Sequence, residues 1–97
     1  MTTMGNDTFE RTFTIKNRLG LHARAASLFV QLASKFAAEV FVEKDGLRVN
    51  GKSIMGVLIL AAGCGSKITV SAQGQDARDA VQALGELIER GFDEDEV

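Results

Sequence analysis

The sequence has one cysteine, one histidine and no long apolar run. Cys64 cannot form an internal disulfide, which favours a reducing compartment. One histidine and one cysteine fall short of the about four ligands that a structural zinc site needs, so we expect no metal, and nothing indicates a cofactor. No segment approaches the roughly 20 apolar residues of a membrane span, and the first residues lack a signal-peptide pattern. We therefore expect a cytoplasmic protein without membrane insertion.

The composition is that of one ordinary globular domain. Of the 97 residues, 45% are apolar and 25% are charged, which is enough for one modest core. The net charge of −2 gives no reason to expect nucleic acid as a partner. We find no repeat, linker or low-complexity segment. We expect a domain over residues 9–91, with flexible tails at residues 1–8 and 92–97, the second one acidic and solvated.

Hydrophobic periodicity predicts seven elements. Residues 9–16, 39–44, 47–50 and 67–73 alternate as strands do, and Asp45-Gly46 is a strong hairpin signal between the second and third. Helices are predicted from Ala23 to about Phe36, from Ser53 to about Leu60, and after Asp76 until Gly91. The order β-α-β-β-α-β-α is consistent with an α+β open-faced sandwich, with helices on one face of an antiparallel sheet.

Two of the predicted helices carry an apolar stripe. In the first, the stripe consists of Ala26, Phe29, Val30, Ala33 and Phe36; in the last, of Ala80, Val81, Leu84, Leu87 and Ile88. Leu28 lies off the first stripe, so it is either an exposed contact for a partner or a scattered surface leucine.

The only histidine lies where a predicted strand gives way to a helix, in Leu19-Gly20-Leu21-His22-Ala23-Arg24-Ala25-Ala26. The first turn of a helix offers backbone N–H groups without internal partners, and its dipole disfavours a cationic imidazole. A neutral imidazole has one unprotonated, nucleophilic nitrogen. His22 is thus a candidate phosphoryl acceptor and donor.

The neighbours of His22 suit an anion. A phosphoryl group on the ring would meet the amides of Ala23 and Arg24, and the Arg24 guanidinium could clamp its oxygens. Gly20 permits a tight turn and the approach of another molecule's backbone. On local pattern alone, however, a histidine here is more often a surface residue or a helix cap.

Ser53 begins the second predicted helix and allows two interpretations. It can be an N-cap hydroxyl, or a modification site at a helix end that tolerates a phosphate. Ile54 and Met55 beside it suit an exposed apolar contact surface, and the alternative is that they belong to the core with Val57 and Leu58.

Two segments in register resemble one family. The run around His22 looks like the active-site signature of HPr, the phosphocarrier of the bacterial sugar phosphotransferase system. The segment Asn50-Gly51-Lys52-Ser53-Ile54-Met55-Gly56-Val57 resembles that family's regulatory serine segment. The resemblance covers about residues 9–90. Ala25 is a local difference, because many members carry proline there.

The resemblance implies a fold and a function. The fold is a four-stranded antiparallel sheet with three helices on one face. The implied protein is a phosphocarrier and not an enzyme: enzyme I, charged from phosphoenolpyruvate, phosphorylates His22, and an enzyme IIA-type domain or its nitrogen-branch counterpart receives the group. Ser53 is implied as a target of HPr kinase/phosphorylase in carbon catabolite regulation, with a catabolite-control regulator as a further partner. Gly20, Leu28, Ile54 and Met55 are expected to dock partners, and the protein is expected to be a monomer.

Two other classes remain open at this point. One is a purely regulatory protein that uses Ser53 as its switch, although such a protein has no need of a nucleophile. The other is a small ligand-binding or assembly module in which His22 is incidental.

Overall fold

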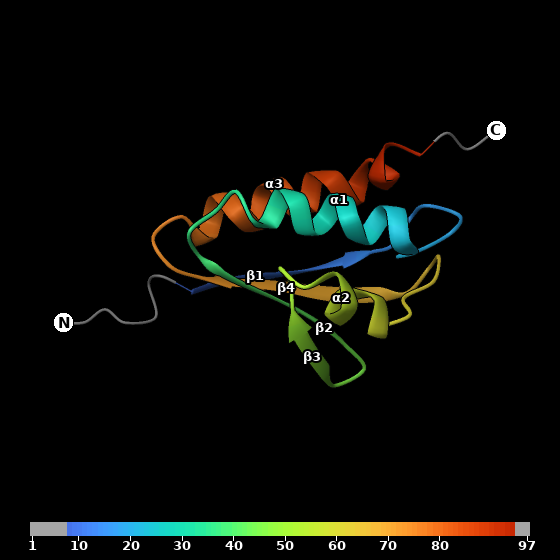
Figure 1. Cartoon of the computed structure of the whole chain (residues 1–97), viewed down its shortest axis with the longest axis horizontal. Coiled ribbons are helices and arrows are strands. Elements are labelled where there is room, and N and C mark those ends of the chain that lie inside the picture. Colours follow the sequence, from blue (N-terminus) through green and yellow to red (C-terminus); the bar gives the residue numbers. More distant parts are fainter. Residues whose placement is uncertain (1–7, 95–97) are drawn as a thin grey trace.

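The computed structural model describes residues 8–94, and in them four strands form one antiparallel sheet with helices packed over it (Figure 1). The elements follow the chain as β1 (Thr8–Thr14), α1 (Ala23–Ala33), β2 (Glu39–Lys44), β3 (Leu47–Asn50), α2 (Ile54–Ile59), β4 (Lys67–Gln73) and α3 (Ala77–Glu89), with a short 3₁₀ turn, η2 (Gly91–Asp93), after α3. The predicted α+β open-faced sandwich is confirmed.

The strands lie in the order β1-β4-β2-β3, so β1 and β3 are the edges. The register opposes Phe13 to Ile68 and Val42 to Val70, and all four of these side chains are buried. Alternation along each strand thus directs one apolar row to the helices. Asp45 and Gly46 both have positive φ, at 51° and 84°, as the two-residue turn of the β2–β3 hairpin requires.

Helices α1 and α3 lie side by side over the sheet, and α2 contacts α1 and β3 (Figure 1). The predicted α3 stripe is fully buried. In α1 the buried residues are Ala25, Ala26, Phe29 and Ala33, whereas Val30 and Phe36 are only partly buried at the edge of the core. The buried face of α1 therefore includes Ala25, which the periodicity did not predict, whereas Val30 and Phe36 are less buried than predicted.

Helix α1 ends earlier than predicted. It stops at Ala33, and backbone polar groups of the segment between α1 and β2 form hydrogen bonds with side chains from elsewhere in the chain. The amides of Ala37 and Ala38 donate to the two carboxylate oxygens of Asp76, at 2.9 and 2.8 Å, and Nζ of Lys52 donates to the carbonyl of Phe36. These partners come from distant parts of the sequence, so local periodicity could not indicate them.

The predicted tails are wrong at their inner ends. Thr8 already belongs to β1, and Phe92 is 1% exposed and part of the core. Burial of an aromatic ring stabilises the segment that carries it, so the predicted tail does not begin at residue 92: Phe92 is packed in the core and Glu94 is partly buried. The remainder of both predicted tails, residues 1–7 and 95–97, lies outside the described residues. Among the described helices none has the length and apolar content needed to cross a membrane.

Candidate functional site

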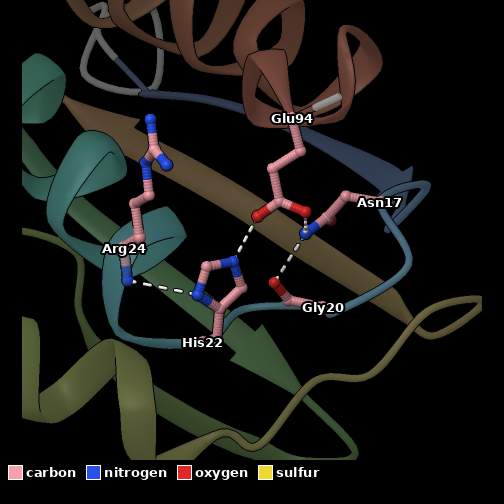
Figure 2. A network of polar contacts seen from close by, with 5 residues as sticks. All are labelled: Asn17, Gly20, His22, Arg24 and Glu94. Carbon is pink, nitrogen blue, oxygen red and sulfur yellow. Dashed lines mark hydrogen bonds and ion pairs between the residues drawn. The ribbon is translucent and has the colours of Figure 1, made fainter. Parts of the chain in front are cut away.

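His22 is the N-cap of α1. Its backbone is extended (φ −78°, ψ −179°), and its carbonyl accepts the first helical hydrogen bond, from Ala26 at 2.8 Å. The side chain turns back on the helix, where Nδ1 accepts a hydrogen bond from the backbone N–H of Arg24 at 3.3 Å (Figure 2). The imidazole therefore lies at the helix mouth, as predicted, and it also acts as a cap.

The other ring nitrogen of His22 contacts a carboxylate from the segment that follows α3. Nε2 lies against Oε2 of Glu94, and Oε1 of the same carboxylate accepts from Nδ2 of Asn17 at 3.2 Å (Figure 2). Asn17 is 1% exposed, and its Nδ2 also donates to the carbonyl of Gly20 at 2.7 Å. A carboxylate only accepts hydrogen bonds, so a proton on Nε2 and a lone pair on Nδ1 satisfy every contact of the ring.

Glu94 is held as an anion. The hydrogen bond with His22 is the largest influence and lowers the pKa of the Glu94 carboxyl from its ordinary value of 4.5. Partial burial acts against this shift, while the Asn17 amide and the electrostatic influence of His22 and of the Arg24 guanidinium lower the pKa further. A negative charge thus lies beside the imidazole over the whole neutral range.

The ring remains within reach of another molecule. The His22 side chain is 29% exposed and the Glu94 side chain 13%. A surface depression of about 340 Å³ opens beside them, lined by Leu19, His22, Arg24, Asp93 and Glu94. Deep burial would have excluded contact with a partner, and the observed exposure permits it.

Gly20 lies at a tight turn that another part of the backbone approaches closely. Its φ of +71° confirms the tight turn, but the residue is buried, and the backbone that approaches it belongs to this chain. A Cβ at this position would lie 2.5 Å from the carbonyl oxygen of Ala62 and 2.8 Å from Cα of Gly63. The loop at residues 62–63 therefore packs closely against Gly20, and the docking role of Gly20 stays a prediction.

Arg24 presents two groups in different directions. Its backbone N–H points at Nδ1 of His22, whereas its exposed guanidinium extends away from the imidazole (Figure 2). The amides of Ala23 and Arg24 belong to the first turn of α1, where an anion is favoured. A clamp by the guanidinium requires only rotation of a solvated side chain.

Ser53 is the N-cap of α2. Its backbone is extended (φ −115°, ψ 118°), and Oγ accepts from the amide of Gly56 at 3.1 Å. The predicted capping role is therefore observed. Because Ser53 is half-buried, a modifying enzyme would have to reach a partly covered oxygen.

An apolar surface surrounds the start of α2. Ile54 and Met55 are 42% and 72% exposed, so the alternative that placed them in the core is wrong. Leu58, also assigned to the core by that alternative, is exposed, whereas Val57 is buried. Leu28 is half-buried against the core, and its docking role stays a prediction.

Other exposed apolar side chains were not predicted from the sequence. Within residues 8–94 the large exposed apolar side chains are Leu19, Ile54, Met55, Leu58 and Ile59, with Leu47 on the hairpin. Leu19 lies beside His22 in the surface depression, so exposed apolar side chains are found both at the imidazole and along α2.

Glu94 and the contacts of Asn17 were likewise not predicted. The four residues that follow Phe92 are all acidic, and such a run is typical of a solvated tail. The signal that could have placed Glu94 is Phe92 itself, an apolar anchor directly after the helix-ending Gly91.

No metal centre is found in the part of the chain that the structure describes. Residues 8–94 contain no group of three or more histidine, cysteine, aspartate or glutamate side chains placed to hold a metal ion. Cys64 is exposed, with Sγ 3.8 Å from the carbonyl oxygen of Lys16.

Comparison with known families gives a clear result. The family model described as "PTS HPr component phosphorylation site" matches residues 9–90. The chain belongs to the HPr family of the phosphotransferase system. The match includes the His22 junction and the Ser53 segment, and the family is one of phosphocarrier proteins.

Individual relatives support the same assignment. The phosphocarrier protein HPr of Xylella fastidiosa is 49% identical over 89% of this chain and 97% of its own. The HPr-like protein Crh of Halalkalibacterium halodurans is 49% identical over 84% of this chain and 96% of its own. The crystal structure of HPr-C-His from Thermoanaerobacter tengcongensis superposes with a TM-score of 0.86 at 50% identity, covering 90% of this chain and 98% of that one. Crh of Bacillus subtilis, described as a domain-swapped dimer, superposes with a TM-score of 0.70 at 43% identity, over 81% of this chain and 91% of that one.

Proposed function

We propose that this protein is a phosphocarrier that accepts a phosphoryl group on Nδ1 of His22 from enzyme I and passes it to an enzyme IIA-type domain. The observation that carries the proposal is the position of Nδ1, which lies at the N-terminus of α1 with its lone pair directed at the Arg24 amide. A nucleophile and an anion-binding helix end therefore meet at one atom.

The transfer needs few groups from this chain. Nδ1 attacks phosphorus as the bond between phosphorus and the donor atom of enzyme I breaks, and the electron pair of that bond stays on the donor atom. The incoming oxygens replace Nδ1 as acceptors for the first-turn amides of Ala23 and Arg24. The Arg24 guanidinium then pairs with the phosphoryl oxygens, for which its planar fork is suited.

The apolar surface beside α2 supports a docking role. Ile54 and Met55 would meet enzyme I and enzyme IIA-type domains, and a covered patch would exclude water during transfer. Ser53 borders this surface, so phosphorylation by HPr kinase/phosphorylase would place charge where partners dock. The similarity to Crh proteins supports such a regulatory role, including recognition by a catabolite-control regulator.

Two further expectations belong to the proposal. A cytoplasmic location agrees with the single exposed Cys64 and with partners that carry phosphoryl groups from phosphoenolpyruvate. The monomer stays a prediction, because a relative forms a swapped dimer; sedimentation of the purified chain tests it.

The deciding experiment combines the chain with enzyme I and phosphoenolpyruvate and measures its mass at neutral and at acid pH. One added phosphoryl group that is lost in acid identifies a phosphohistidine, and His22→Ala should abolish it while the circular dichroism spectrum stays that of the wild type. Acid-stable phosphate, or acid-labile phosphate on the variant, would contradict the proposal. Absence of any phosphohistidine on the wild type would favour a regulatory or assembly module.

A further inference from the structure

An unusual turn after α3 places the carboxylate of Glu94 beside His22. Gly91, Phe92 and Asp93 have φ values of 67°, 58° and 58°, a left-handed turn in which two of the three residues are not glycine. Left-handed backbone costs about 1–2 kcal/mol per non-glycine residue. With this turn after α3, Phe92 is buried and Glu94 lies beside the imidazole of His22 (Figure 2).

The carboxylate of Glu94 is bound through both of its oxygens. Oε2 contacts Nε2 of His22, and Oε1 accepts from Asn17, whose amide also donates to the carbonyl of Gly20. Asn17 is buried, so this second contact fixes the direction of the carboxylate. Asn17 in the loop before α1 thus orients Glu94, and Glu94 contacts the imidazole, although His22 and Glu94 are 72 residues apart in sequence.

We infer that Glu94 is a positioning residue for phosphotransfer, which keeps the proton on Nε2 of His22 and stabilises the positively charged ring that forms when Nδ1 carries a phosphoryl group. The inference rests on the function proposed above. The transfer proposed there uses only Nδ1, the first-turn amides and the Arg24 guanidinium, so this carboxylate adds a component to the site.

The proton and charge balance shows why the carboxylate matters. When Nδ1 forms its bond to phosphorus, the ring gains a positive charge, and the Nε2 proton stays in place, donated to Glu94. When the phosphoryl group leaves for the acceptor, the electron pair of the N–P bond returns to Nδ1 and the neutral ring is restored. A fixed carboxylate that holds one imidazole nitrogen and stabilises the imidazolium is the arrangement found in catalytic triads.

Ring spectroscopy tests the contact directly. We compare the ¹⁵N resonances of the His22 ring in the wild type, Glu94→Gln and Glu94→Ala at about pH 9, above the ordinary range of an imidazole. The wild type should show the Nε2–H tautomer with a protected proton. Glu94→Gln should keep that tautomer and the protection, because the amide oxygen still accepts. Glu94→Ala leaves the ring only the 3.3 Å contact from the Arg24 amide, so it should lose proton protection and shift the ring resonances. Identical ring spectra in the wild type and Glu94→Ala would overturn the inference.

Transfer kinetics separate charge from hydrogen bonding. Both variants should accept phosphoryl groups from enzyme I about tenfold more slowly than the wild type, since neither can stabilise the cationic ring. Glu89→Gln is the matched control: it removes one charge and an ion pair with Lys16 from α3 and should transfer at the wild-type rate.

The outcomes distinguish the two proposals. A wild type that never becomes phosphorylated removes the proposed function, and with it the role of Glu94 in transfer. A wild type that is phosphorylated at the same rate as Glu94→Gln overturns the inference about Glu94 alone. Thermal melts of all variants confirm that each comparison is made on folded protein.

Discussion

The backbone N–H of Arg24 donates to Nδ1 of His22 across 3.3 Å, in the first turn of α1. This local contact gives Arg24 two separable functions. Its amide belongs to the helix and survives any change of side chain, whereas its guanidinium is exposed and available to an anion.

Arg24→Ala should slow phosphoryl transfer about 10- to 100-fold, somewhat less than the loss of one donor to developing charge in an enclosed active site. Stability should change by no more than about 0.5 kcal/mol, because an exposed cation in the first turn of a helix contributes little to folding and opposes the dipole. A transfer assay and a urea titration on the same sample measure both quantities.

Arg78→Ala provides the control for loss of an exposed arginine. Arg78 lies in the first turn of α3, with its guanidinium 5.7 Å from the ring centre of Phe9. The start of α3 lies near the C-terminal end of α1, where Asp76 binds the Ala37 amide, whereas His22 lies at the N-terminal end of α1. Its variant should transfer at the wild-type rate. Equal slowing by both variants would mean that overall charge, and not a clamp at His22, sets the rate.

Ser53→Asp should reduce the rate of His22 phosphorylation by enzyme I by roughly tenfold, through charge placed beside Ile54 and Met55. Aspartate is itself a favoured N-cap, so α2 should persist, as the circular dichroism spectrum will show. Ser53→Asn keeps the cap without the charge and should react like the wild type. A slow Ser53→Asn variant would instead assign the effect to the hydroxyl.

The parts of the fold that rest on local pattern were predicted well. The structure of β2, the β2–β3 turn and α3 depends on signals that lie within a few residues of one another. These signals are the alternation in residues 39–44, the Asp45-Gly46 pair and the apolar stripe of α3. The junction at His22 was likewise found from its neighbours, since a lone histidine before a helical stripe is a local signal.

Contacts between distant segments were not predictable in this way. The Glu94 contact joins residues 72 apart. Phe92 is an apolar residue within an acidic segment, but the local sequence does not show that its burial brings Glu94 to His22. Gly20 shows the same limit, because its local sequence indicated a tight turn but not that the backbone at Ala62 would fill the space above it. Tertiary packing decides such features.

Gly20→Ala should destabilise the fold by about 3 kcal/mol, the sum of left-handed strain and a clash that well-packed backbone cannot relieve. The added Cβ would lie 2.5 Å from the carbonyl oxygen of Ala62. Gly46→Ala isolates the strain, because φ is +84° there and, apart from residues 45–47 themselves, no atom of the described chain lies within 4 Å of the place that the new methyl group would take. It should lose only about 1 kcal/mol. Equal losses in urea titrations would show that the close approach adds nothing.

Asp76 should make stability depend on pH in the acid range. The hydrogen bond from the Ala37 amide is the largest influence that lowers the pKa of the Asp76 carboxyl from its ordinary value of 3.8, assisted by the Ala38 amide and the charge of Lys52 and opposed by desolvation. Because the pKa is lower in the folded state, the unfolded chain binds more protons as the pH falls. The contribution of Asp76 is therefore complete above pH 3.8 and is lost as the pH falls below that value through the folded pKa. Urea titrations between about pH 2 and 6 should show the loss in the wild type.

Asp76→Asn identifies the carboxylate responsible for that loss. The variant should be less stable than the wild type near neutral pH, since a neutral amide is a weaker acceptor for the two backbone N–H groups of Ala37 and Ala38. It should also lose less stability on acidification, so that the two curves converge at low pH. Asp79→Asn removes a charge from the first turn of the same helix without removing an acceptor from those amides, and should keep the wild-type loss. Parallel curves for the wild type and Asp76→Asn would show that the hydrogen bonds from the Ala37 and Ala38 amides to Asp76 do not cause the loss of stability in acid.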